Sequence, residues 1–162
     1  HADRLVMANI AQTVNVLQAM LLTDGQALVL TPSYHVFEMN KGHHDAEVLA
    51  LALRGAAPVR EVQGKELVTF SASASTRDGR VLISLTNLDA EEPLAVELDL
   101  RGARLGTPTA RVLTADAIGA HNTATDTPVA PRALDGVRLE GTTLHVTLPA
   151  HSFATVDLPV LP

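Results

Sequence analysis

Cysteine and tryptophan are both absent from this sequence of 162 residues. The lack of cysteine excludes disulfides, thiolate metal ligands and cysteine nucleophiles. Aromatic side chains are also few, since one Tyr and three Phe are the whole supply. The core must therefore be built from Val, Leu, Ile and Ala, and a sugar-binding platform of exposed aromatic rings is not expected.

Positive charge is scarce as well. Twelve Lys and Arg stand against 18 Asp and Glu, which gives a net charge of −6 without a cluster of basic residues. We therefore expect no nucleic-acid partner, because binding to phosphates requires a basic surface. No apolar run reaches the roughly 18 residues that span a bilayer, and no signal peptide is recognisable, so no membrane partner is expected. The absence of cysteine suits a reducing compartment, and we expect a cytoplasmic location.

What is present is typical of a folded chain, with 46% hydrophobic and 19% charged residues. Two regions of different character follow one another. In residues 1–45, Leu5–Ala11 is an almost continuously apolar run, the pattern of a strand buried on both faces. Asp24-Gly25 between two apolar segments predicts a hairpin. Thr31 and Pro32 predict a helix start, and Gly42 predicts its end.

From about residue 46 onward, short apolar or alternating segments recur between turn signals, which predicts a mainly β fold, an antiparallel β-sandwich of about seven strands. Within Leu94–Leu100 the leucines and the valine share one face, while Glu97 and Asp99 take the other. The expected strands are Val48–Leu53, Leu67–Ala74, Val81–Leu88, Leu94–Leu100, Ala110–Thr114, Leu144–Leu148 and Ala154–Leu158. The long connection Gly119–Gly136 interrupts this rhythm, so we expect it to be functional or packed against a neighbour.

The histidines do not predict a metal site. His35, His43 and His44 lack the i, i+3 or i+4 spacing that places ligands on one helix face. We interpret His43 and His44 as a solvated helix end, where His favours the helix dipole. His151, near a strand start, is expected to form hydrogen bonds in a turn. No phosphate-binding Gly-rich loop is present, and no cofactor is expected.

Several stretches are more specific than their composition. Ala2–Leu17 resembles the end of the catalytic barrel of family 51 α-L-arabinofuranosidases, and Thr31–Met39 resembles the last barrel helix of that family. The sandwich of the same family is similar to three further stretches: Ser84–Asp89, His121–Thr123 and Leu148–Phe153. These stretches follow the family order along essentially the whole chain.

The resemblance implies the C-terminal portion of a retaining glycoside hydrolase that removes terminal α-L-arabinofuranosyl groups from hemicellulose or arabino-oligosaccharides. Residues 1–45 would be the final strand–helix unit of a (β/α)8 barrel, and residues 46–162 a jelly-roll-like sandwich. A retaining glycosidase needs two carboxyl groups about 5–5.5 Å apart. In the family both are Glu residues on earlier barrel strands, so no catalytic residue is expected in this chain.

One substrate-binding residue is implied by the resemblance. Gln12, in an Ala-Gln-x-Val-Asn motif, would follow the last barrel strand and bind the hydroxyls of the arabinofuranose. From its position alone, Gln12 could equally cap a strand end. A side-chain carboxamide suits sugar binding because it offers a donor and an acceptor without a charge.

The expected partners are the N-terminal portion of the barrel, an arabinofuranosyl oligosaccharide substrate and further copies in a homo-oligomer. We expect the upstream chain to cover residues 1–45, because an isolated apolar strand would expose its edges. The alternative interpretation is a non-catalytic β-sandwich that binds carbohydrate or mediates assembly. Only the enzyme interpretation requires Gln12 to face a sugar pocket.

Overall fold

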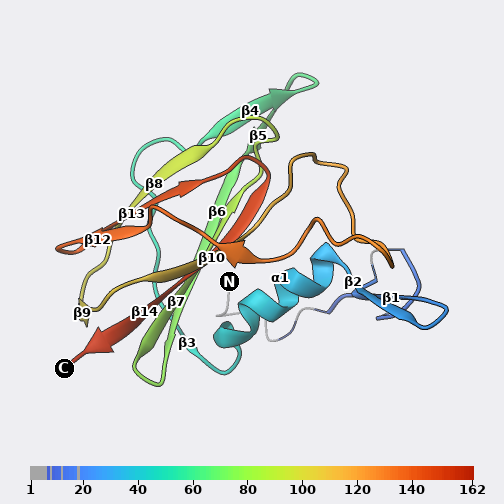
Figure 1. Cartoon of the computed structure of the whole chain (residues 1–162). Helices are drawn as coiled ribbons and strands as arrows, with labels where there is room; N and C mark the ends of the chain where they lie inside the picture. The colour runs from blue at the N-terminus through green and yellow to red at the C-terminus, as the bar shows by residue number, and fades with distance from the viewer. Residues whose placement is uncertain (1–6, 8, 12, 18) are drawn as a thin grey trace.

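The computed structural model describes residues 7, 9–11, 13–17 and 19–162 (Figure 1). Antiparallel strands dominate it, and a single α-helix lies beside the sheets. In this described part of the chain, no helix combines the length and the apolar character needed to cross a membrane.

A short α/β segment precedes the main body. It contains the strands β1 (Leu21–Asp24) and β2 (Ala27–Leu30), the helix α1 (Pro32–Asn40) and the 3-10 turn η1 (Lys41–His43). The strands that follow are β3 (Glu47–Val48), β4 (Val59–Val62), β5 (Lys65–Val68), β6 (Phe70–Arg77), β7 (Arg80–Asn87), β8 (Leu94–Asp99), β9 (Arg104–Leu105), β10 (Thr109–Leu113), β11 (Arg132–Ala133), β12 (Arg138–Glu140), β13 (Thr143–Leu148) and β14 (Ser152–Leu161).

Two antiparallel sheets form the main body. The larger follows the order β11-β10-β14-β7-β6-β3, with β9 pairing with the end of β14. The smaller follows the order β12-β13-β8. The two sheets enclose one hydrophobic core, so the predicted antiparallel β-sandwich is confirmed.

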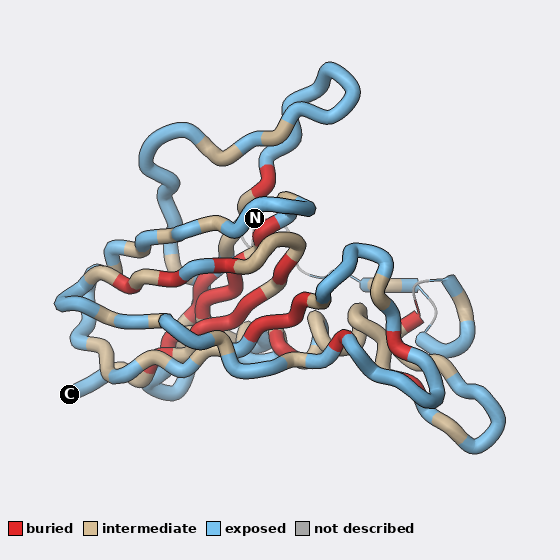
Figure 2. Tube along the Cα trace, turned by 45° about the horizontal axis from the view of Figure 1, so that its top comes forward, coloured by how far each residue is buried: buried red, intermediate tan, exposed pale blue. Residues whose placement is uncertain are grey.

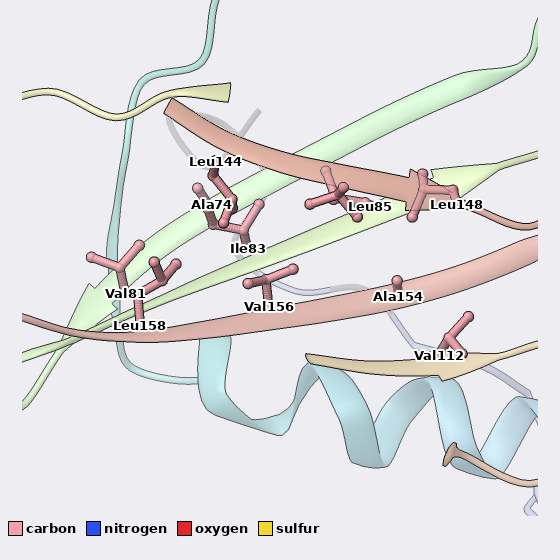
Figure 3. Packing of buried hydrophobic residues seen from close by; sticks show 11 residues of the cluster. Ala74, Val81, Ile83, Leu85, Val112, Leu144, Leu148, Ala154, Val156 and Leu158 are labelled. Carbon is pink, nitrogen blue, oxygen red and sulfur yellow. The ribbon is translucent and has the colours of Figure 1, made fainter. Parts of the chain in front are cut away.

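The core lies between β13 of the smaller sheet and the β7–β14 pair of the larger (Figure 3). The most deeply buried side chains come from alternate positions of these strands: Ile83, Leu85, Leu144, Val146, Leu148, Val156 and Leu158. Val, Leu and Ile side chains thus fill the core, as the scarcity of aromatic residues predicts. On the edge strand β8 the predicted alternation is confirmed, since its leucines and its valine are half-buried while Glu97 and Asp99 are exposed.

Helix α1 covers the other face of the larger sheet (Figures 1 and 3). Thr31 caps it as predicted, and Oγ1 of Thr31 accepts a hydrogen bond from the Tyr34 amide at 3.4 Å. The prediction for Gly42 is wrong in detail, because α1 ends at Asn40 and Gly42 lies within η1. A Cβ at Gly42 would lie 2.8 Å from Cδ2 of Leu82. Glycine therefore serves here for close packing against β7, not as a helix cap.

The hairpin predicted at Asp24-Gly25 is confirmed as β1–β2. Its two-residue turn begins at Gly25, whose φ of +58° is the left-handed conformation that suits glycine. By contrast, the predicted strand Leu5–Ala11 is not formed by its described members: Met7, Asn9, Ile10 and Ala11 lie in no strand. A strand requires a neighbour for its backbone hydrogen bonds, and none of the described strands pairs with these four residues. The other members of the run lie outside the described residues.

The sequence did not predict the hairpin β4–β5, which projects from the sandwich as an exposed arm (Figures 1 and 2). Its turn is Gln63-Gly64, and both residues have positive φ. Arg60 of β4 binds the carboxylates of Asp89 and Glu91 in the loop after β7. This double ion pair fastens the base of the arm to the sandwich.

Candidate functional site

Gln12, the predicted sugar-binding residue, lies outside the described residues. The segment that follows it is described and strongly organised around Asn15. Nδ2 of Asn15 donates to Oγ1 of Thr23 at 2.6 Å, and the Thr23 amide donates to Oδ1 of Asn15 at 2.7 Å. One carboxamide therefore engages both the side chain and the backbone of a residue in β1.

Asn15 has a φ of +54°, a left-handed conformation that Asn tolerates better than most residues. This geometry folds the chain back, so that the Asn15 amide donates to the Leu21 carbonyl at 3.0 Å. The Leu21 amide in turn donates to the carbonyl of Thr13, also at 3.0 Å. Thr13 is the residue covalently bonded to Gln12, so this loop anchors the chain directly after the predicted site.

Asn122 ties the long connection Gly119–Gly136 to the same region. It is 5% exposed, and its Nδ2 donates to the carbonyls of Leu30 and Val129 at 2.8 Å each. The Val129 amide donates back to Oδ1 at 2.9 Å. Both hydrogens of Nδ2 and one of the two lone pairs of Oδ1 are therefore used. Because Leu30 is the last residue of β2, these bonds connect the long connection to the α/β segment. Asn122 thus holds the long connection against the α/β segment, as expected for a connection that packs against a neighbour.

A groove of about 430 Å³ opens beside this junction. Its lining is mainly apolar and comes from the start of α1, the loop after β7, the long connection and the start of β14. Leu88 and Ile118 on its rim are 62% and 75% exposed. The groove does not bring together acidic side chains, and its shape and chemistry suit an apolar contact better than a sugar.

The histidine interpretation is correct for His44 and wrong for His43. His44 is exposed and pairs with Asp45. His43, in contrast, turns back onto the sheet, where Nδ1 lies 2.7 Å from Oγ of Ser75 and Nε2 lies 2.8 Å from Oγ of Ser84. Desolvation by burial lowers the pKa of His43, as it does that of His35. Across the described residues, no group of three or more His, Cys, Asp or Glu has the geometry of a metal site.

His151 forms the predicted turn contacts. Its amide donates to the Asp89 carbonyl at 2.6 Å, and its ring nitrogens lie 3.0 Å from the Ala90 carbonyl and 2.8 Å from the Ala115 carbonyl. The residue has a φ of +37°, a strained conformation that these three contacts hold in place. His151 therefore joins the loops at one end of the sandwich.

The carboxylates of Asp89 and Glu38, both in the described part of the chain, form ion pairs, and Asp89 also accepts hydrogen bonds in a turn. Asp89 accepts hydrogen bonds from Arg60 and from the amides of Glu91 and Glu92, and these hold the pKa of the Asp89 carboxyl well below its usual range. Glu38 on α1 pairs with Arg111 on β10 at 2.9 Å. Both arrangements fasten one element to another.

Comparison with known proteins identifies the family. The family model of the α-L-arabinofuranosidase C-terminal domain matches residues 1–152. The chain belongs to this family. The match to the family model covers both the α/β segment and nearly all of the sandwich, so the two regions occur together in other members of the family.

Relatives of the arabinofuranosidase C-terminal domain agree in sequence and in structure. An intracellular exo-α-L-arabinofuranosidase of Bacteroides ovatus is 38% identical over 98% of the chain. The crystal structure of the glycoside hydrolase family 51 arabinofuranosidase from Xanthomonas axonopodis pv. citri is 45% identical over 98% of the chain, with a TM-score of 0.90. The family 51 α-L-arabinofuranosidase of Bifidobacterium longum is 27% identical over 97%, with a TM-score of 0.82.

The chain spans only about a third of the length of these relatives. It covers 31% of the Bacteroides protein and 32% of the Xanthomonas chain. This agrees with a domain of a larger protein. The resemblance of the motif stretches to family 51 is therefore confirmed at the level of the family.

Proposed function

We propose that this chain is the C-terminal portion of a retaining α-L-arabinofuranosidase that removes terminal α-L-arabinofuranosyl groups from hemicellulose or arabino-oligosaccharides. Residues 1–45 complete its catalytic barrel, and residues 46–162 form its sandwich. The observation that carries the proposal is the match of an arabinofuranosidase family model from residue 1 through residue 152. The catalytic Glu pair belongs to an upstream part of the protein.

The surface of residues 1–45 supports this division. Large apolar side chains are exposed there in the isolated chain: Met7, Val14, Leu17, Leu28 and Phe37. Leu17 is 92% exposed, which is costly for a side chain of this size. An upstream barrel that packs against this segment would remove these side chains from water. We further propose a cytoplasmic, homo-oligomeric enzyme; its Bacteroides relative carries the description intracellular.

Gln12 is the residue of this chain that we assign to substrate binding. The anchored loop around Asn15 supports the assignment, because it fixes the chain directly after Gln12. A loop held by several hydrogen bonds can present a side chain without a large loss of conformational entropy on binding.

The test is Gln12→Ala in the full-length protein, assayed on an aryl α-L-arabinofuranoside. We expect kcat/KM to fall about 10- to 1,000-fold, the scale of losing one or two hydrogen bonds in the transition state. Gln26→Ala is the matched control, because Gln26 is an exposed amide in the β1–β2 turn. If the wild type is active and Gln12→Ala leaves kcat/KM unchanged, Gln12 does not take part in substrate binding. Absence of arabinofuranosidase activity in the full-length wild type would refute the enzyme assignment and leave the assembly or carbohydrate-binding interpretation.

A further inference from the structure

His43 occupies the point where the α1–η1 unit meets the outer face of the larger sheet. Its half-buried ring lies between Ser75 of β6 and Ser84 of β7. Both serines are 5% exposed, so bulk water has little access to their hydroxyl groups. Ser84 continues the chain of contacts, because its Oγ donates to Oδ1 of Asn40 at 2.8 Å.

The direction of each hydrogen bond in this chain is fixed by Asn40. Nδ2 of Asn40 donates to the Val36 carbonyl at 3.0 Å, so its Oδ1 must be the acceptor for Ser84. The single proton of the Ser84 hydroxyl is thereby used, and Ser84 Oγ can only accept from the ring of His43.

His43 must therefore carry a proton on Nε2. Its Nδ1, which lies 2.7 Å from Oγ of Ser75, then accepts the proton of that hydroxyl. The neutral Nε2–H tautomer satisfies every donor and acceptor from Ser75 to Asn40, whereas the Nδ1–H tautomer would leave Nε2 and Ser84 as two facing acceptors.

We propose that His43 is a pH-sensitive latch, which holds the α1–η1 unit on the larger sheet while its imidazole is neutral and loosens that unit when the ring is protonated. Protonation places a hydrogen on Nδ1, so the Ser75 hydroxyl must turn its own proton away. Ser75 is buried, and in the described part of the chain its side chain contacts no acceptor other than this ring. The cost is an unsatisfied hydroxyl together with a poorly solvated charge.

Charged groups on the surrounding elements do not offset that cost. They are Glu38 on α1, Lys41 in η1, Glu47 on β3, Arg77 on β6 and Arg80 on β7. Glu38 pairs with Arg111, Arg77 donates to the His44 carbonyl, and Arg80 pairs with Asp157. The described contacts of the His43 ring are the two serine hydroxyls, and burial lowers its pKa below the ordinary 6.5.

The sign of the pH effect follows from this lowered pKa. The unfolded or detached state takes up a proton near pH 6.5, while the latched state resists it. The latch is therefore fully effective above pH 6.5, and its contribution is lost as the pH falls below that value. The inference concerns the fold of this chain and does not depend on the role proposed for Gln12.

Hydrogen exchange of residues 36–46 in the full-length protein tests the latch. After correction for intrinsic exchange rates, we expect protection of this segment to fall about tenfold between pH 7.5 and pH 5, the scale of leaving one buried hydroxyl without its hydrogen bond. His43→Gln removes the titration but retains a donor and an acceptor, so its protection should be nearly constant. His44→Gln changes an exposed neighbour and should behave like the wild type.

Three results would overturn the latch. The first is a wild type whose protection does not change with pH. The second is a His43→Gln variant that loses as much protection as the wild type. The third needs no variant and remains decisive if His43→Gln fails to fold: it comes from the ¹⁵N chemical shifts of the His43 ring at pH 7.5, which should report a neutral ring protonated on Nε2. A ring protonated on Nδ1 contradicts the proposed chain of hydrogen bonds.

Discussion

Replacement of Asn122 by alanine is the sharpest test of how the two regions are joined. The change removes the two hydrogen bonds that Nδ2 donates to the Leu30 and Val129 carbonyls, and the one that Oδ1 accepts from the Val129 amide. Because Asn122 is 5% exposed, water cannot easily replace these contacts. At about 1 kcal/mol for each hydrogen bond, the local free energy of opening should fall by about 3 kcal/mol.

Hydrogen exchange is the appropriate assay, since a protein of several domains need not unfold in one step. A loss of about 3 kcal/mol corresponds to a decrease in protection of more than about 100-fold, expected at the Val129 amide and in the segment around it. His121→Ala is the matched control, because His121 is the exposed neighbour and its ring lies 3.2 Å from the Gly119 carbonyl, a contact within its own loop. A change of less than about threefold in Asn122→Ala would refute the reasoning.

Two further predictions concern other junctions. Asn15→Gly keeps the left-handed backbone but removes both contacts that the Asn15 side chain makes with Thr23. Exchange of the Thr23 amide should therefore accelerate about tenfold or more, and kcat/KM of the full-length enzyme should fall. The control is Gln63→Gly, at an exposed left-handed position (φ +51°), which should leave both measurements unchanged. The pKa of Asp89 is depressed by Arg60, so its stabilising contribution is present above the ordinary value of 3.8 and is lost as the pH falls below it. Thermal unfolding between pH 5 and pH 2.5 should show this loss in the wild type and less of it in Asp89→Asn, and equal slopes would contradict the assignment.

Local signals in the sequence predicted the elements that short-range chemistry determines. Asp24-Gly25 located the β1–β2 turn, Thr31 and Pro32 located the start of α1, and alternation identified the inner face of β8. In each case the determining residues lie within a few positions of one another. The β4–β5 arm was missed because its strands are exposed and rich in charge, and because Gln63-Gly64 is a weaker turn signal than Asn-Gly.

The contacts of His43 could not be predicted in this way. Its partners Ser75 and Ser84 lie 32 and 41 positions further along the chain. Nothing in the local sequence distinguishes His43 from the exposed His44 next to it. Only the packing of η1 on β6 and β7, which the bare Cα of Gly42 permits, turns one of the two rings inward.

The motif stretches of the sandwich show what the family resemblance had detected. Ser84–Asp89 contains Asn87, which is 1% exposed and donates to the Glu92 and Pro149 carbonyls. In Leu148–Phe153, Ser152 also donates to the Pro149 carbonyl, at 2.7 Å. These polar side chains are buried and organise loops. A match between such motifs therefore reports a shared loop architecture, and it identifies the fold more directly than the chemistry.

The boundary near residue 45 is not a free linker. Met39 on α1 is 4% exposed and packs in one cluster with Leu113 and Val129, which belong to β10 and the long connection. The Glu38–Arg111 pair fastens α1 to the same sheet, and the His43 contacts fasten the adjoining η1 to it. If residues 1–45 complete a barrel, as we propose, α1 contributes to two structural units at once. Movement of the barrel relative to the sandwich would then require the Met39 cluster to open, so the two units should behave as one body while α1 stays in place.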